Sequence, residues 1–224
     1  DEQEAPLGTV IVFQDISERK RVEQELIQLS HYDSLTGLAN RAYFHVSLKK
    51  AVARACRTGK WVGLFFLDLD GFKSVNDTQG HEHGDLLLKE IAERLLKCVR
   101  KGDLVARLGG DEFTLFMEDV DRFEQFGAFA EKILAAISEP IRLGQNYEAT
   151  VTASIGIATF PTCGSDSGTL IKNADIAMYR AKQLGRNNYQ FFTDEMQFDV
   201  VHRASIENWL RQSIDQEQLS LLYQ

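Results

Sequence analysis

The chain of 224 residues has little cysteine, little proline and no long apolar run. Its three cysteines (Cys56, Cys98 and Cys163) are widely spaced and include no CxxC pair, so we expect free thiols in a reducing cytoplasm. No apolar stretch approaches the roughly 20 residues that cross a bilayer. The acidic start, DEQEAPLG, also lacks the regions of a secretory signal. We therefore expect no membrane contact within these residues, while a longer protein could still carry an anchor.

Basic residues are also in the minority. The chain has 25 Lys and Arg against 33 Asp and Glu, which gives a formal net charge of -8. A nucleic-acid scaffold needs a basic stripe, so this balance predicts no nucleic-acid partner. A phosphate ligand would have to be held by a few local Lys or Arg side chains, or by a metal ion.

Hydrophobic patterning predicts a main domain, residues 31–193, in which helices and strands alternate. We expect helices over 40–57, 85–99, 122–138 and 167–184, a buried strand over 61–70, a loop over 71–84, a hairpin around GGDE, a second hairpin from 141–143 and 147–160, and a last strand over 189–192. This order predicts an α+β fold (an α/β sandwich), with a central mixed, largely antiparallel sheet covered by helices.

The two flanks read as pieces of other units. Residues 1–14 contain one strand, 9–14, and look like the tail of a preceding domain. Residues 15–30 predict a charged helix, either a short coiled coil or a solvated linker, and the pattern does not separate the two. Residues 194–224 predict a polar helical segment that ends in the strand-like run LSLLYQ.

Two carboxylates end the buried strand. Asp68 and Asp70 are two residues apart, so their side chains share one face if the strand continues that far. The carboxyl end of a central strand suits a ligand site, although one of the two could simply cap the next helix. An EF-hand is excluded, because its sixth position is Lys73 and its twelfth is Gln79.

The hairpin turn carries a second acidic pair. Asp111 and Glu112 are adjacent, which is unfavourable without a cation or proton donor between them. If this hairpin neighbours the buried strand, four carboxylates crowd one spot, and Mg²⁺ with a phosphate ligand would stabilise them. Gly109 and Gly110 would let that ligand approach the backbone.

Several polar residues could complete such a site. Lys73 follows the first acidic pair, and Lys182 and Arg186 lie four apart at a helix end, where they could hold phosphate or remain solvated surface charges. Asn76 and Asp85 could bind a guanine edge, although Asp85 also stands where a helix N-cap is expected. The histidines of HEHG have no nearby cysteine, which disfavours a zinc site.

Five ordered motifs between residues 31 and 192 resemble those of the GGDEF family of diguanylate cyclases. They are DSLTGLANR (33–41), FLDLDGFKSVND (66–77), GHEHGD (80–85), RLGGDEF (107–113) and ADIAMYRAKQLGRN (174–187). Ser34 stands where the family commonly has proline. The resemblance implies a fold like that of nucleotidyl cyclases and polymerase palms. It also implies the condensation of two GTP to cyclic di-GMP and two pyrophosphates, with Mg²⁺ as cofactor, for which Mn²⁺ could substitute.

The resemblance also implies residue roles. Asp68, Asp111 and Glu112 would bind the metal through their side chains and Leu69 through its carbonyl, and Asp111 would also act as the base for the ribose 3′-hydroxyl. The substrate would be contacted by the guanine-binding pair Asn76 and Asp85, by His81, by the phosphate-binding Lys73, Lys182 and Arg186, and by Gly109 and Gly110. Because the product is two-fold symmetric and each domain offers one GTP site, we expect a homodimer.

Regulation is implied as well. Arg100 and Asp103 match an RxxD product site for cyclic di-GMP and feedback inhibition, although Arg100 also suits the end of a helix. The flanks resemble the end of a PAS domain and the start of an EAL phosphodiesterase domain. Two alternatives to a working cyclase are a catalytically silent GTP-binding domain that controls an attached EAL domain, and a pure interaction domain.

Overall fold

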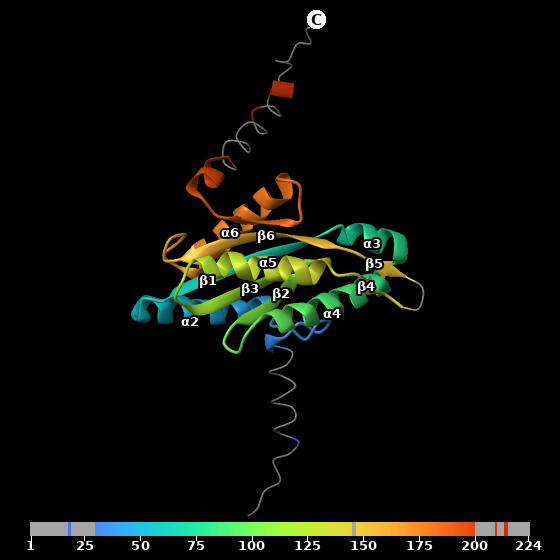
Figure 1. The fold of residues 1–224 in the computed structure, drawn as a ribbon, viewed down its shortest axis with the longest axis horizontal. Helices are drawn as coiled ribbons and strands as arrows, with labels where there is room; N and C mark the ends of the chain where they lie inside the picture. The colour runs from blue at the N-terminus through green and yellow to red at the C-terminus, as the bar shows by residue number, and fades with distance from the viewer. Residues whose placement is uncertain (1–17, 19–29, 145–146, 200–208, 210–212, 215–224) are drawn as a thin grey trace, which may run out of the picture.

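A computed structural model describes residues 18, 30–144, 147–199, 209 and 213–214 of the chain (Figure 1). Its helices and strands follow one another in the order α2 (Arg41–Thr58), β1 (Trp61–Asp70), α3 (Phe72–Gln79), α4 (His81–Cys98), β2 (Leu104–Gly109), β3 (Glu112–Val120), α5 (Glu124–Ser138), β4 (Ile141–Arg142), β5 (Glu148–Ala149), β6 (Thr152–Phe160), α6 (Ser167–Gln183) and β7 (Asn188–Phe191).

The main sheet has β1 at its centre. Its strand order is β2-β3-β1-β6-β7, and all neighbours are antiparallel except β6 and β7, which are parallel. A second, two-stranded sheet pairs β4 with β5. The expected α+β fold with a mixed, largely antiparallel sheet is confirmed.

Helices cover both faces of the sheet. Alternate residues of β1 point to opposite faces, so Phe65 packs with α4 and α5 in one core cluster. Leu64 and Phe66 pack with α2 and α6 in another. Figure 1 shows α4 and α5 crossing in front of the strands. This two-sided burial explains why the sequence of β1 is a continuous apolar run rather than an alternating one.

The stretch predicted as a loop is helical, which corrects the expectation for residues 71–84. Gly71 precedes α3, and Gly80 separates α3 from α4. Both glycines have left-handed φ angles of 83°, so the chain bends there without strain. Asp85 consequently lies one turn inside α4, and the expected N-cap role is wrong.

The second predicted hairpin is also shorter than expected. It consists of β4 and β5 alone, whereas β6 leaves it and joins the main sheet next to β1. Gly156 of β6 packs so tightly against α6 that an added Cβ would lie 1.9 Å from the carbonyl oxygen of Ala174. This contact brings α6 close to the sheet and places its end beside β1.

The predicted strand 9–14 lies outside the described residues, as does most of the linker helix 15–30. Of the segment 194–224, the structure describes residues 194–199, which are helical, and positions 209 and 213–214. Among the residues that the structure places, no helix is both long and apolar enough to span a bilayer.

Candidate active site

The two acidic motifs meet at one end of the central strands. In the pairing of β1 with β3, Asp68 lies directly opposite Glu112. One residue further, the backbone N–H of Leu69 donates to the carbonyl oxygen of Asp111 over 3.4 Å. The hairpin therefore neighbours the buried strand, which meets the condition set for a shared acidic site.

This proximity changes the acidity of the carboxyls. Burial raises the pKa of Asp68, and repulsion from Asp111 adds to the rise while the nearby Lys182 opposes it. Burial also raises the pKa of Glu112, with further repulsion from Asp175 and Asp68. Both groups would hold their negative charge more easily beside an added cation.

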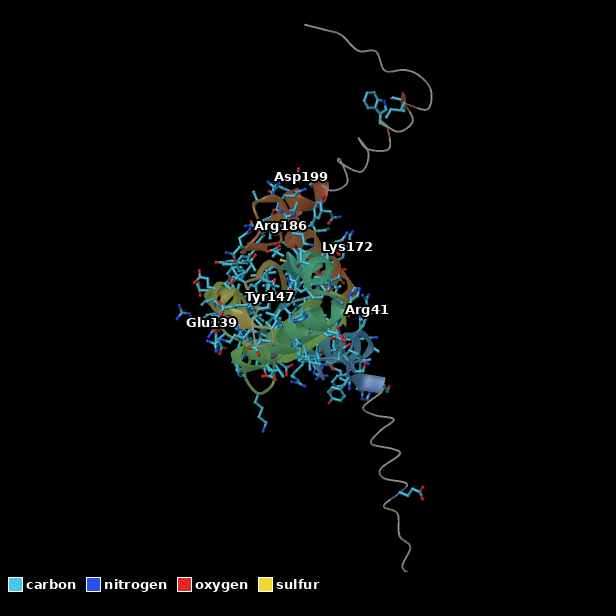
Figure 2. All side chains as sticks on the ribbon, turned by 90° about the vertical axis from the view of Figure 1, so that its right-hand side faces the viewer. Arg41, Glu139, Tyr147, Lys172, Arg186 and Asp199 are labelled. Atoms are coloured by element: carbon cyan, nitrogen blue, oxygen red, sulfur yellow. The ribbon has the colours of Figure 1, made fainter. Side chains whose placement is uncertain are left out.

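Two cations, one in the last turn of α6 and one in the loop after it, lie near the carboxylates at the end of β1. Lys182 Nζ lies 2.7 Å from Asp68 Oδ2, and Arg186 Nε lies 3.9 Å from Asp70 Oδ1. The side chain of Arg186 is 63% exposed, so its guanidinium can also contact a ligand. Arg186 lies in the upper part of the folded body, whereas Arg41 lies lower (Figure 2).

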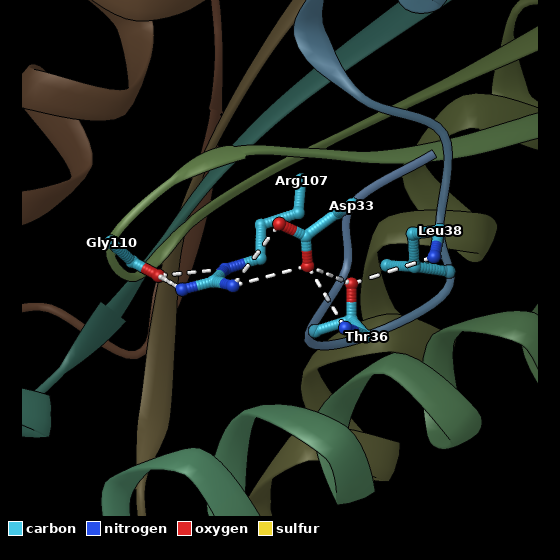
Figure 3. Close-up of polar contacts among 5 residues, drawn as sticks. All are labelled: Asp33, Thr36, Leu38, Arg107 and Gly110. Carbon is cyan, nitrogen blue, oxygen red and sulfur yellow. Dashed lines mark hydrogen bonds and ion pairs between the residues drawn. The ribbon is translucent and has the colours of Figure 1, made fainter. Parts of the chain in front are cut away.

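The GGDE turn is built on backbone that favours glycine. Gly109 and Gly110 have φ angles of 144° and 54°, both in the left-handed range. The turn is held by Arg107, whose Nε and Nη2 donate to the carbonyl oxygen of Gly110 over 2.9 and 2.8 Å (Figure 3). The same guanidinium reaches Asp33, with Nη1 3.1 Å from Oδ1.

Asp33 is itself fixed by its own loop. Its Oδ1 accepts hydrogen bonds from the backbone N–H and the hydroxyl of Thr36, over 2.9 and 2.6 Å (Figure 3). Burial alone would raise the pKa of Asp33, but these bonds and Arg107 outweigh it, so the pKa is lowered. The opening motif of the domain is thus tied to the GGDE turn through one ion pair.

The residues predicted to bind the base lie on α3 and α4. An added Cβ on Gly84 would lie 1.9 Å from Asn76 Oδ1, so the absence of a side chain lets the two helices approach there. Asn76 Oδ1 is buried with no hydrogen-bond partner in the described part of the chain. Asp85, the residue after Gly84, is exposed on α4, as are Lys73 on α3 and His81 at the start of α4.

Asp70 is engaged by other elements, so the expectation of four acidic side chains sharing one ligand is not met, although its charge adds to the rise in the pKa of Asp68. Its oxygens accept hydrogen bonds from Thr152 and Ser154 of β6 and from the backbone of Asn187. The N-cap of α3 is Gly71, so Asp70 is not a helix cap either. Across the described ranges, no group of three or more His, Cys, Asp or Glu side chains is arranged to hold a metal ion.

The residues of the RxxD motif contact each other. Arg100 Nε lies 3.4 Å from Asp103 Oδ1, and Arg100 Nη2 donates to the carbonyl oxygen of Glu118 over 2.6 Å. The side chain of Asp103 is only 2% exposed, while that of Arg100 is 54% exposed. The arginine is therefore the accessible member of the pair.

Three residues of this region were missed by reasoning from the sequence. Arg107 and Asp33 hold the GGDE turn, and Asp175 adds negative charge near Glu112. The only local signals were the position of Arg107 just before the glycines and that of Asp33 in a recurring motif.

The protein is an open-sheet α+β domain with acidic residues and nearby cations at one end of its central strands. Comparisons with known proteins give its family. The family model for "Diguanylate cyclase, GGDEF domain" matches residues 30–188, which is most of the chain. The chain belongs to the GGDEF family.

Curated relatives agree with this assignment. The bifunctional diguanylate cyclase/cyclic di-GMP phosphodiesterase MucR of Pseudomonas aeruginosa is 44% identical over 204 residues, which cover 91% of this chain and 30% of MucR. The cyclic di-GMP phosphodiesterase PdeR of Escherichia coli is 38% identical over 94% of this chain and 31% of its own length. The chain spans between 20% and 38% of the length of such relatives.

Solved structures show the same fold. A structure of only the GGDEF domain of TpbB from P. aeruginosa matches with a TM-score of 0.74 at 36% identity, covering 76% of this chain and 99% of that one. The coiled coil and GGDEF domain of DgcB from Caulobacter crescentus, in complex with cyclic di-GMP, matches with a TM-score of 0.70 at 29% identity, covering 78% and 94%.

Proposed function

We propose that this domain is an active diguanylate cyclase that condenses two GTP to cyclic di-GMP and two pyrophosphates. The observation that carries the proposal is the meeting of three elements at one edge. Asp68 on β1 lies opposite Glu112 on β3, and Lys182 of α6 lies 2.7 Å from Asp68. Carboxylates and cations at one edge are the groups that phosphoryl transfer needs to position and stabilise a charged phosphate.

The substrate would span from the acidic edge to helices α3 and α4. Asn76 and Asp85 would hydrogen-bond the guanine, with His81 contacting the nucleotide. The triphosphate would be held by Lys73, Lys182 and Arg186. Gly109 and Gly110 carry no side chain at the turn, which supports a close approach of the nucleotide to the backbone.

The chemistry of the donor set suits a hard divalent cation such as Mg²⁺, although in the described part of the chain the three carboxylates are not gathered around one point. Asp68, Asp111 and Glu112 would supply carboxylate oxygens and Leu69 its carbonyl oxygen, the ligand chemistry that Mg²⁺ prefers. Burial raises the pKa of both Asp68 and Glu112, a cost that a bound cation would relieve. When bound, the ion would neutralise the negative charge that develops on the phosphate oxygens.

In the reaction, the ribose 3′-hydroxyl of one GTP attacks the α-phosphorus of the other. A new phosphodiester bond forms, the bond to pyrophosphate breaks, and Asp111 accepts the hydroxyl proton. In a second step, the remaining ribose 3′-hydroxyl attacks the remaining α-phosphorus, which releases the second pyrophosphate and closes the ring. One domain offers one GTP site, so two copies must face each other about a two-fold axis.

We propose that the product also binds outside the active site. Arg100, with a half-exposed guanidinium beside Asp103, could grip phosphate or stack on guanine. Such binding would give feedback inhibition.

We also propose a larger arrangement, in which the domain 31–193 follows a PAS-like remnant (1–14) and a signalling helix (15–30). An EAL-like domain would begin within 194–224. The names of relatives that combine cyclase and phosphodiesterase activities are consistent with this order.

The alternative is a catalytically silent GTP-binding domain that regulates an attached phosphodiesterase. It is favoured by the similarity to PdeR, whose name gives phosphodiesterase activity alone. The test is to incubate the purified chain with GTP and Mg²⁺ and to separate the products by chromatography. Formation of cyclic di-GMP supports the cyclase, GTP binding without pyrophosphate release supports the silent domain, and no GTP binding removes both.

A further inference from the structure

Asp70, the last residue of β1, has its carboxylate fully engaged by neighbouring elements. Oδ2 accepts from the Thr152 hydroxyl over 2.8 Å and from the backbone N–H of Asn187 over 3.1 Å. Oδ1 accepts from the Ser154 hydroxyl over 2.8 Å. The Asp70 side chain is only 6% exposed, so it points into the protein between β6 and the loop that follows α6.

That loop has a backbone that needs support. Gly185, Arg186 and Asn187 have φ angles of 109°, 62° and 47°, so two consecutive residues with side chains adopt the left-handed region. Residues other than glycine rarely adopt this conformation unless the surroundings hold them. The hydrogen bond from Asn187 N–H to Asp70 holds the second of the two, and the N–H of Arg186 donates to the carbonyl oxygen of Ala181 over 3.2 Å.

Arg186 is oriented by the same carboxylate but keeps its charge available. Its Nε lies 3.9 Å from Asp70 Oδ1, which is beyond hydrogen-bond distance, and its side chain is 63% exposed. The buried carboxylate therefore attracts the arginine toward the end of the central strand β1 without occupying its hydrogen-bond donors.

We propose that Asp70 is a positioning residue for nucleotide phosphates. It fixes the left-handed turn at 186–187 and so aims the Arg186 guanidinium at the acidic edge formed by Asp68 and Glu112. This inference rests on the proposed function, because it takes the phosphates of GTP as the ligand of Arg186. A purely structural role for Asp70 would affect the binding of GTP and of guanosine alike. A positioning role would affect only the binding of GTP, which carries phosphates.

The test compares binding of GTP and of guanosine by calorimetry to the whole chain and to Asp70→Asn. The substitution keeps the shape of the side chain but removes its charge and one acceptor. We expect GTP to bind about ten-fold more weakly and guanosine to bind within about two-fold of the original chain. Arg186→Ala should weaken GTP similarly, and the double variant should bind no more weakly than Arg186→Ala, because both changes act through one arginine.

Asp166→Asn is the matched control, since Asp166 also accepts two backbone N–H groups, from Gly168 and Thr169 at the start of α6. It should lower thermal stability and leave the ratio of GTP to guanosine affinity unchanged. If Asp70→Asn does not fold, Thr152→Val removes one donor to Asp70 and should weaken GTP about three-fold, with guanosine unchanged.

The outcomes separate this inference from the proposed function. GTP binding that is unchanged in Asp70→Asn (or in Thr152→Val, where that variant is used) but weakened in Arg186→Ala overturns the positioning role and leaves the cyclase proposal intact. An equal loss of GTP and guanosine binding also overturns it. Failure of the unsubstituted chain to bind GTP removes the proposed function itself, and the positioning role with it.

Discussion

Lys182 Nζ lies 2.7 Å from Asp68 Oδ2, so a cation of the protein already neutralises a carboxylate that we propose as a metal ligand. Lys182 is also proposed to bind the phosphates of GTP. The same ammonium group therefore has two competing partners. A metal ion at Asp68 would release it toward the nucleotide, which couples the binding of the two ligands.

Replacing this lysine should separate the two effects. In Lys182→Met, Asp68 loses its cation, so a divalent ion should bind about five-fold more tightly without nucleotide, while GTP should bind at least about ten-fold more weakly. Titration with Mn²⁺ followed by electron paramagnetic resonance measures the first change, and calorimetry with GTP measures the second. Lys172→Met, an exposed position on the same helix, should change neither. Mn²⁺ affinity that does not increase would contradict competition between lysine and metal.

The proposed catalytic role of Asp111 predicts a loss of turnover without a loss of fold. Asp111→Asn keeps the size of the side chain but cannot accept the proton of the ribose hydroxyl, so turnover should fall at least about 100-fold. The melting temperature should change by less than about 2 °C. Cyclic di-GMP formation and a thermal melt measure the two quantities. Asp121→Asn, which touches only an exposed ion pair with Lys60, should keep full activity, and turnover retained in Asp111→Asn would refute the assignment.

The contacts of Arg107 with the GGDE turn predict that Arg107→Ala lowers the free energy of unfolding. Arg107→Ala removes two hydrogen bonds to Gly110 and the ion pair with Asp33, in a site where the arginine side chain is only 11% exposed. We expect the free energy of unfolding in urea to fall by about 1–3 kcal/mol. Arg54→Ala breaks the ion pair with Glu118, in which the arginine is 48% exposed, and should cost less than about 1 kcal/mol. Equal losses in the two variants would show that the Arg107 contacts carry no special stability.

The sequence predicts the strands and most helices because their buried residues recur as apolar runs or at helical spacing. The run at β1 is apolar on both faces, and α5 and α6 show clear apolar stripes. The short helix α3 was missed because only Val75 among its eight residues is buried, and two glycines flank it. Its helicity is stabilised by packing on α4 rather than by its own pattern.

The residues of the candidate site also divide into those that a local sequence pattern indicates and those that it does not. Asp68, Asp111 and Glu112 could be selected from the sequence because carboxylates at such spacing carry a recognisable chemistry. The pair of Arg107 with Asp33 spans 74 positions, and that of Asp70 with Asn187 spans 117. No local pattern relates residues so far apart, so these supporting contacts depend on the topology of the sheet.

The raised pKa of Glu112 predicts that removing its charge stabilises the metal-free domain. Burial is the largest cause of the rise in this pKa. When the pKa of an acid is raised in the folded state, the folded protein loses stability as the pH rises from the unfolded pKa through the folded pKa. Glu112→Gln should therefore melt about 2 °C higher than the original chain at pH 7. The difference should vanish below about pH 4, where the carboxyl is protonated in both the folded and the unfolded chain. Thermal melts in metal-free buffer across this range provide the measurement. A lower melting temperature of Glu112→Gln at pH 7 would contradict the destabilisation that we attribute to burial and repulsion of the Glu112 charge.

The exposed guanidinium of Arg100 predicts that its removal weakens product inhibition. Its guanidinium must leave the carbonyl oxygen of Glu118 or share its donors when it grips a phosphate of cyclic di-GMP. Arg100→Ala should raise the concentration of cyclic di-GMP that halves activity by about ten-fold, because a charge-assisted contact is lost while the active site is untouched. Initial rates at increasing cyclic di-GMP measure this change. Lys101→Ala, at the exposed next residue, should keep the inhibition of the original chain. Inhibition that stays the same in Arg100→Ala would place the product elsewhere, and the half-exposed arginine would then be only a contact between the end of α4 and β3.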